Sequence, residues 1–265
     1  MSTTAVSTTA TSALLEVRDL SVSFGGVKAL QGVSFDVKAG EIFSIIGPNG
    51  AGKTTIFNCL SGLFRPTAGS IRLDGRELVG LPPKELAALG VARTFQNLGL
   101  FEHLSVMDNV LLGRHHLMQT SILSNALRLR STGREERAHR ERVADILELF
   151  GLAREARTEI GVLPYGVRKL IEIARALAME PKLLLLDEPV AGMNHEETAR
   201  ISEAILDVRR RERTGMVLVE HDMRMVMTIS DRLMAIDFGQ HVATGHPHEI
   251  QNNPRVIEAY LGRAA

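Results

Sequence analysis

The sequence predicts an α/β fold whose core has a mainly parallel sheet, with an antiparallel β region near the N-terminus and an inserted helical subdomain. In the second half of the chain, short apolar runs alternate with helical patterns, as in parallel strands joined by helices. Ahead of them, residues 14–24 and 33–37 show the period-two alternation of half-buried strands. Between the two regions, residues 97–161 carry helical spacing.

Composition limits the classes of function. A length of 265 residues suits one large domain, or a core with an inserted subdomain. The 31 basic and 31 acidic residues balance, which gives no support to nucleic-acid binding through bulk charge. Cys59 is the single cysteine, which fits a reducing cytosol. No apolar run approaches the ~20 residues that span a bilayer, so we expect any membrane role to be peripheral.

The N-terminal half is expected to begin with antiparallel strands. We expect residues 1–13, rich in Ser, Thr and Ala, to be a disordered tail rather than a signal peptide. After the first two strands, residues 71–73 and the Asp74-Gly75 pair predict a strand and a tight turn. A short helix follows from Pro82 to about Gly90. Residues 91–95 then predict a strand that ends at Gln96.

The helical region begins with a capping-box-like start at Ser105 to Asp108. Apolar residues recur at helical spacing over 143–150, and Gly151 is expected to end that helix. The arginines between them could lie near anionic lipid headgroups. Interleaved glutamates favour the alternative, a solvated helix face.

Past this region the core resumes with a helix over 166–180, stopped by Pro181. A second helix face, over 201–208, is expected to end at Gly215. Buried strands are expected at 182–187, 216–220 and 233–236. The expected division is a single domain over 14–262, with core 14–96 and 162–245, helical subdomain 97–161 and C-terminal helical segment 246–262.

One stretch fits G-x-x-x-x-G-K-[ST], the loop that cradles phosphates, and it consists of Gly47, Pro48, Asn49, Gly50, Ala51, Gly52, Lys53 and Thr54. Its glycines let successive N–H groups point into one concavity. Lys53 would meet the β- and γ-phosphates, Thr54 would ligate Mg²⁺, and Thr55 is counted as a further nucleotide-binding residue. The strand predicted before the loop and the helix after it disfavour the alternative, a flexible glycine turn.

Two carboxylates, Asp187 and Glu188, follow a buried strand at the end where parallel sheets hold their ligands. We expect Asp187 to support Mg²⁺ and Glu188 to deprotonate the attacking water. The alternative is two acids that simply end a strand at the surface, and the phosphate loop elsewhere in the chain disfavours it.

Three further residues carry less information alone. Gln96, at the end of a strand, could contact Mg²⁺ and the water, or be an ordinary polar loop residue. His221 follows the strand at 216–220 and could reach a γ-phosphate, although a histidine there is more often structural. Phe24 could stack on adenine, with core packing equally expected.

Taken together, these residues resemble an ATP-binding-cassette (ABC) ATPase over about residues 14–262. The ordered features are the phosphate loop, Gln96, residues 163–167, Asp187-Glu188, Asn194 and His221. The resemblance implies that Gly166 and its neighbour Tyr165 form the signature loop, which completes the ATP site of a second ATPase subunit. It also implies that the loop ending at Asn194 communicates between the two sites.

The chain departs from the family pattern at several positions. Pro164 stands where a serine is usual, Tyr165 replaces a glycine and Val167 replaces a glutamine. Asn194 stands where Asp is usual, and Phe24 where Tyr is common. The catalytic set within one chain is intact, so we expect ATPase activity with ATP and Mg²⁺ as cofactors.

A closer resemblance is to the importer ATPases for branched-chain and other hydrophobic amino acids, carried by residues 92–97, 163–166, 191–194 and 260–262. It implies a cytoplasmic protein, peripheral on the inner face of the membrane. Its partners would be a second ATPase subunit (the same or a related chain), membrane permease subunits and, indirectly, a solute-binding protein, with no nucleic acid. The alternatives are an exporter ATPase for a lipid or glycolipid, and a non-transport ATPase acting on ribosomes or DNA ends, which the single cassette and short insert disfavour.

Overall fold

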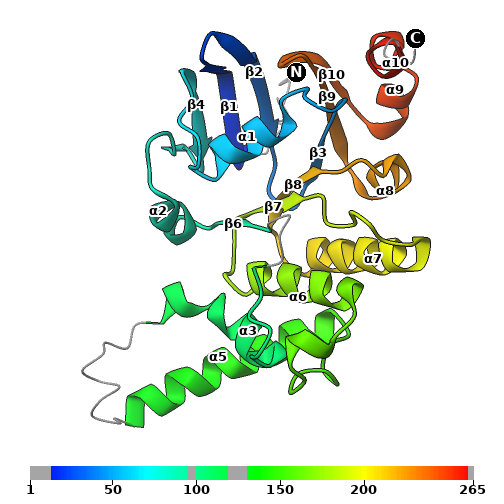
Figure 1. Ribbon diagram of the computed structural model, residues 1–265. Helices are drawn as coiled ribbons and strands as arrows, with labels where there is room; N and C mark the ends of the chain where they lie inside the picture. Colours follow the sequence, from blue (N-terminus) through cyan, green and yellow to red (C-terminus); the bar gives the residue numbers. More distant parts are fainter. Residues whose placement is uncertain (1–12, 95–98, 119–129, 262–265) are drawn as a thin grey trace, which may run out of the picture.

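A computed structural model describes residues 13–94, 99–118 and 130–261 of the chain. Two sheets occupy the upper part of the molecule in Figure 1, and a group of helices lies below them. Gln96 and residues 262–265 fall outside the described residues, so the predictions made for Gln96 and Gly262 have no structural outcome.

The first sheet is antiparallel, in the order β2-β1-β4-β5, which confirms the predicted N-terminal β region. Its strands are β1 (Leu15–Phe24), β2 (Val27–Val37), β4 (Ala68–Leu73) and β5 (Arg76–Glu77). Alternate residues of β1, among them Leu15 and Val17, are buried, because a pleated strand turns every second side chain toward the core.

The second sheet is parallel except for its edge strand β10, in the order β10-β9-β3-β8-β7-β6. Its strands are β3 (Ile42–Ile46), β6 (Val91–Arg93), β7 (Leu183–Asp187), β8 (Gly215–Val219), β9 (Arg232–Asp237) and β10 (Gln240–Gly245). Every residue of β3, β7 and β8 is buried, as the continuous apolar runs predicted. The carboxyl ends of these three strands therefore meet at one edge.

Helices flank this sheet, and those between residues 106 and 177 form the lower group in Figure 1. The helices are α1 (Lys53–Leu60), α2 (Pro83–Ala88), α3 (Val106–Leu112), α5 (Arg130–Leu149), α6 (Tyr165–Leu177), α7 (His195–Arg211), α8 (Met223–Ile229), α9 (Pro247–Gln251) and α10 (Pro254–Leu261), with 3₁₀ turns η1 (His115–Leu117) and η2 (Ile160–Val162).

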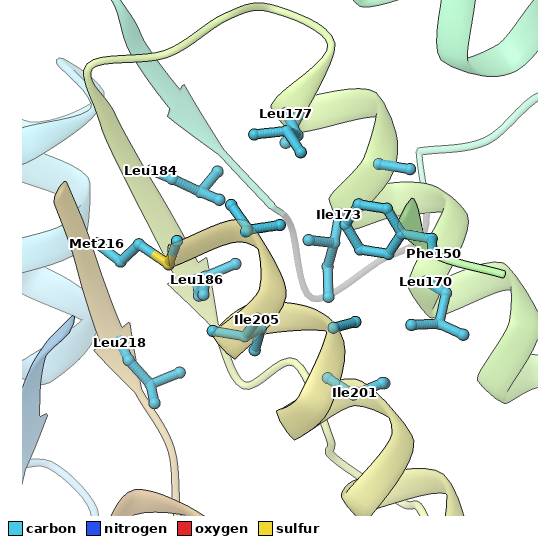
Figure 2. Packing of buried hydrophobic residues seen from close by; sticks show 14 of the residues in the cluster. Phe150, Leu170, Ile173, Leu177, Leu184, Leu186, Ile201, Ile205, Met216 and Leu218 are labelled. Atoms are coloured by element: carbon cyan, nitrogen blue, oxygen red, sulfur yellow. The ribbon is translucent and has the colours of Figure 1, made fainter. Parts of the chain in front are cut away.

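Each face of the parallel sheet has its own hydrophobic core. Leu184, Leu186, Met216 and Leu218 pack with side chains of α6 and α7, as Figure 2 shows. The intervening strand residues belong to the second core, which includes side chains of α1 and the antiparallel sheet. Burial of each such side chain stabilises the fold by about 1.5–3 kcal/mol. The sheet is thus packed on both faces, and this packing holds in place the edge at which its strands end.

The helical region is tied to the sheet by buried polar side chains. Ser105 caps α3 and accepts from the N–H of Asp108 at 3.1 Å, as the sequence predicts. Arg114 donates to His139 Nδ1 at 2.8 Å and to Glu180 at 3.0 Å, joining α5 to the turn before β7. Helix α6 packs against α3 as well as against the sheet. The boundaries at 97–161 stay a prediction.

Two predicted helix ends are wrong. Helix α6 ends at Leu177 rather than at Glu180, which has a left-handed φ of 53°. Helix α7 ends at Arg211 rather than at Gly215, because Glu212 is already extended and accepts from Arg142 at 2.6 Å. Gly215 instead opens β8. A Cβ there would lie 2.6 Å from Leu14 Cδ2 and 3.0 Å from the carbonyl oxygen of Lys38, so glycine is required by close packing.

Cys59 offers a chemical test of how firmly α1 is packed. Burial raises the pKa of its thiol to about 11, so little thiolate forms near neutral pH. We expect iodoacetamide to alkylate Cys59 far more slowly in the native protein at pH 8 than in urea, followed by intact mass. Equal rates in both solvents would contradict the packing of α1.

Candidate nucleotide site

The predicted phosphate loop lies between β3 and α1 and is held on both sides. A Cβ on Gly47 would lie 2.2 Å from the carbonyl oxygen of Ile236, and one on Gly52 would lie 2.9 Å from that of Ala29. Gly52 also caps α1 with φ of 109°, a left-handed conformation that favours glycine. The loop therefore cannot accept side chains at these two positions.

Lys53 lies inside this loop. Its side chain is only 6% exposed, and Nζ donates to the carbonyl oxygens of Gly47 at 2.6 Å and Pro48 at 3.0 Å. Burial lowers the pKa of Lys53, and the charge of Glu188 opposes that shift. The two hydrogen bonds thus hold the ammonium at the loop, where it is attracted electrostatically by the Glu188 carboxylate.

The side chains expected to hold a metal ion offer oxygen atoms. Thr54 is exposed at the first turn of α1, and Asp187 ends β7 with its N–H donated to Thr94 Oγ1 at 3.1 Å. A hydroxyl and a carboxylate are hard ligands that suit Mg²⁺, which usually takes one or two protein ligands and completes its shell with phosphate and water. The residues present therefore fit the ion.

Arg93 was missed by sequence reasoning. At the end of β6 it donates to Asp187 Oδ2 at 2.7 Å, to Asn58 at 2.8 Å and to Ser61 at 2.7 Å. Its guanidinium carbon also lies 5.7 Å from the centre of the Phe57 ring. It therefore neutralises Asp187 and joins that carboxylate to α1. An arginine ending the strand beside β7 was the only signal in the sequence.

Glu188 and His221 lie next to each other where β7 and β8 end. His221 Nε2 lies 3.2 Å from Glu188 Oε1, and the Glu188 N–H donates to the carbonyl oxygen of Val219 at 2.9 Å. Glu188 has φ of 46°, in the left-handed region. Such a conformation costs on the order of 1–3 kcal/mol in a non-glycine residue and is often found at functional sites. The carboxylate is partly exposed and can accept a proton from a water molecule.

Phe24 ends β1 with 47% of its surface exposed, so core packing is not its role. Its ring meets that of Phe64 edge-on, with centres 5.2 Å apart. Stacking on a nucleobase stays a prediction.

Tyr165, Gly166 and Asn194 form a second group at the starts of α6 and α7. Gly166 is buried, and a Cβ there would lie 2.7 Å from Glu197 Oε1. Asn194 Oδ1 accepts from the N–H groups of Glu196 at 2.9 Å and Glu197 at 3.0 Å, while Glu197 accepts from the N–H of Asn194. This capping box was legible in the pattern N-x-x-E but was not predicted. Contact of this group with a nucleotide stays a prediction.

Two features are absent from the described part of the chain. Within residues 13–94, 99–118 and 130–261, no three His, Cys, Asp or Glu side chains are grouped to hold a metal ion. In the same ranges, no helix is both long and apolar enough to cross a bilayer.

Comparison with known proteins gives consistent matches. The family model described as ABC transporter matches residues 30–191, and one described as branched-chain amino acid ATP-binding cassette transporter matches residues 240–265. The chain is 44% identical to the high-affinity branched-chain amino acid transport ATP-binding protein LivG of Salmonella typhimurium, over 95% of this chain and 98% of that protein. It is 43% identical, with the same coverage, to BraF of Pseudomonas aeruginosa, which carries the same description.

Solved structures agree. An ATP-binding cassette of an ABC transporter in its ADP conformation is 30% identical, with a TM-score of 0.82 over 95% of this chain and 100% of that one. A nucleotide-free ATP-binding cassette is 31% identical, with a TM-score of 0.80 over 94% of this chain and 99% of that one.

The Arg93–Asp187 pair predicts a stability effect. Both side chains are buried, so Arg93→Met leaves an uncompensated carboxylate and is expected to lower the free energy of unfolding by about 3–5 kcal/mol. Urea denaturation measures this loss. The control is Arg18→Met, which breaks an exposed pair with Glu16 and is expected to cost ~0–1 kcal/mol. Equal effects of the two substitutions would contradict the role given to Arg93.

Proposed function

Because the chain belongs to the ABC transporter family, we propose that it is the ATP-hydrolysing subunit of an importer for branched-chain or other hydrophobic amino acids. The observation that carries the catalytic part is the contact between His221 and Glu188, at the sheet edge where the phosphate loop also begins. The cargo class is supported by the descriptions of the relatives and by the match of residues 240–265.

Nucleotide binding in this proposal uses residues around the loop. Backbone N–H groups of residues 47–54 and the Lys53 ammonium bind the phosphates, with Thr55 in the first turn of α1, whose N-terminus favours anions. Phe24 stacks on the adenine, an interaction of ~1–3 kcal/mol by analogy with other base–aromatic contacts. Its exposed ring, supported from the side by Phe64, is suited to that role.

Thr54 and Asp187, together with Gln96, would hold Mg²⁺, which when bound neutralises charge on the β- and γ-phosphate oxygens. Arg93 contributes by holding the Asp187 carboxylate through Oδ2. The other oxygen of Asp187 is then oriented by a rigid strand end rather than by a mobile side chain.

Hydrolysis requires a base beside the γ-phosphate. Glu188 accepts the proton of the attacking water, a role that typically contributes ~10²–10⁴ in rate. His221 orients the Glu188 carboxylate through the 3.2 Å contact and would lie beside the transferred phosphoryl group. Gln96, three residues after Arg93 in the sequence, would position the same water.

A second ATPase subunit, the same or a related chain, completes each site. Tyr165 and Gly166 at the start of α6 would meet the γ-phosphate bound to the opposite subunit, with Asn194 at the junction between the two sites. Moving such a dimer from mostly open to mostly closed takes ~5.5 kcal/mol of differential ATP binding. Charge-assisted contacts to the triphosphate can supply it, and hydrolysis removes them.

The proposed membrane partners are permease subunits. They would contact this chain on the cytoplasmic face of the membrane, through the helical region near residues 97–161. The protein would be peripheral there. A solute-binding protein would act indirectly, by delivering the amino acid to the permease rather than to this chain.

The role of Glu188 leads to the first functional prediction. Glu188→Gln keeps the shape of the side chain and loses the base, so ATP binding is expected to persist while kcat falls by ~10²–10⁴. ATP should then trap closed dimers, detected by light scattering. Glu203→Gln, an exposed glutamate on α7, is the control and should hydrolyse ATP normally. Rapid turnover by the Glu188 variant would exclude the proposed role.

The transport assignment is tested by purification of the full chain from detergent-solubilised membranes, with identification of the proteins that accompany it. We expect permease subunits without cassettes of their own. After reconstitution in vesicles, ATP hydrolysis should rise several-fold with a solute-binding protein loaded with leucine, isoleucine or valine. Stimulation by a lipid instead would support an exporter, and association with ribosomes or DNA would refute transport.

A further inference from the structure

Glu220 is a buried acid to which the proposed mechanism gives no task. It follows the last residue of β8, directly before His221, and is 4% exposed. Among the described residues it has no lysine or arginine within ion-pair distance. A buried carboxylate is costly unless its oxygens are hydrogen-bonded, so its partners explain why the site accepts it.

Those partners are backbone N–H groups of two loops. Oε1 accepts from the N–H of Val190 at 2.9 Å. Oε2 accepts from the N–H of His221 at 2.6 Å and from that of Asp222 at 3.2 Å. One oxygen therefore holds the loop that follows Glu188, and the other holds the loop that carries His221. Hydrogen bonds to an ionised acceptor are roughly twice as strong as neutral ones.

The same two loops meet at the catalytic contact. The Glu188 N–H donates to Val219, and His221 Nε2 lies 3.2 Å from Glu188 Oε1. The carboxylate of Glu220 is a second link between the two loops. Its two oxygens are a fixed distance apart and each holds one loop, so the carboxylate limits how far the loops can separate. The loop over 188–194 and the turn over 220–222 are consequently joined as one unit around the pair of Glu188 and His221.

An amide or an alcohol could not do the same. A carboxamide has one oxygen and an NH₂ group, so one of the two loops would face a donor. Glu41 gives the contrast within this chain, since it also is buried and accepts the Lys38 N–H at 2.7 Å, but it is paired with Arg232. In the described part of the chain, Glu220 accepts hydrogen bonds from backbone N–H groups alone, and those donors surround the catalytic pair.

We propose that Glu220 is a positioning residue that holds His221 against Glu188 and joins the loop leading to Asn194 to the same unit. This inference rests on the proposed ATPase function, because its catalytic consequence is expressed through His221. The loop at 188–194 also reaches Asn194, so the unit extends from the hydrolytic pair to the segment expected to face the second subunit.

The test substitutes Glu220 in the full-length chain. Glu220→Gln is expected to lower kcat on the order of 10- to 100-fold, the loss typical of a small misplacement of catalytic groups. The KM for ATP should change less than about twofold, since the phosphate loop is untouched. Glu220→Asp keeps both oxygens but is one methylene shorter, so it should fold and show the same split between kcat and KM.

A double variant separates positioning from general destabilisation. If Glu220 acts through His221, Glu220→Gln combined with His221→Ala is expected to be no slower than His221→Ala alone, within about twofold. Multiplicative losses would overturn the proposal. Glu41→Gln is the matched control, because it removes one oxygen of a buried carboxylate at the opposite end of β3; its kcat, per folded molecule, should equal that of the unmodified chain.

Amide hydrogen exchange supplies a readout that needs no hydrolysis. In Glu220→Gln, exchange at residues 188–194 and 220–222 should rise together, while Glu41→Gln leaves both segments protected. Faster amide exchange in one segment only, or in neither, would overturn the proposal that Glu220 joins the two loops. Absence of ATP hydrolysis by the unmodified chain would refute the proposed function instead, and the exchange comparison would still decide whether Glu220 joins the two loops.

Discussion

The parallel register of β3, β8 and β7 is the constraint on which the site depends. Ile45 of β3 and Asp187 of β7 both pair with Val219 of β8, so the three strands end at one level. At that level β3 leads into the phosphate loop, β7 is followed by Glu188, and β8 leads into the turn that carries His221. Since each strand is buried on both faces, a slip of one residue would turn its side chains into the opposite core and disrupt the packing of both cores, which makes the alignment costly to change.

Two adjacent acids at this edge have different surroundings, and these suit different tasks. Asp187 is buried and neutralised by Arg93, so it is held as a fixed anion. Glu188 points to a more open position, in a left-handed backbone conformation, with His221 as its neighbour. A fixed anion fits a ligand for a cation, whereas an accessible carboxylate can exchange a proton with water. The backbone turn at Glu188 separates the two side chains.

Features formed by residues close together in the sequence could be predicted, whereas features that depend on contacts between distant segments could not. The buried strands β7 and β8 were predicted because an apolar run carries the signal within itself, and the phosphate loop because its residues are contiguous. Arg93 was missed because its partner Asp187 is distant in sequence and only the pairing of β6 with β7 brings them together. The end of α7 was misplaced because Glu212 leaves the helix to meet Arg142, a contact between distant segments.

The second group of predicted residues occupies a part of the fold that can transmit movement. Helix α6 starts at Tyr165 and buries Leu170, Ile173 and Leu177 in the core shared with α7 and the sheet. It also packs against α3, so its N-terminus and the helical region move as one body if that packing persists. A force applied at Gly166 would therefore reach α3 without crossing a flexible joint in the described residues. The start of α6, where we propose that the nucleotide of a second subunit binds, thus belongs to a helix that packs against α3 and α5, the helices furthest from the parallel sheet in Figure 1.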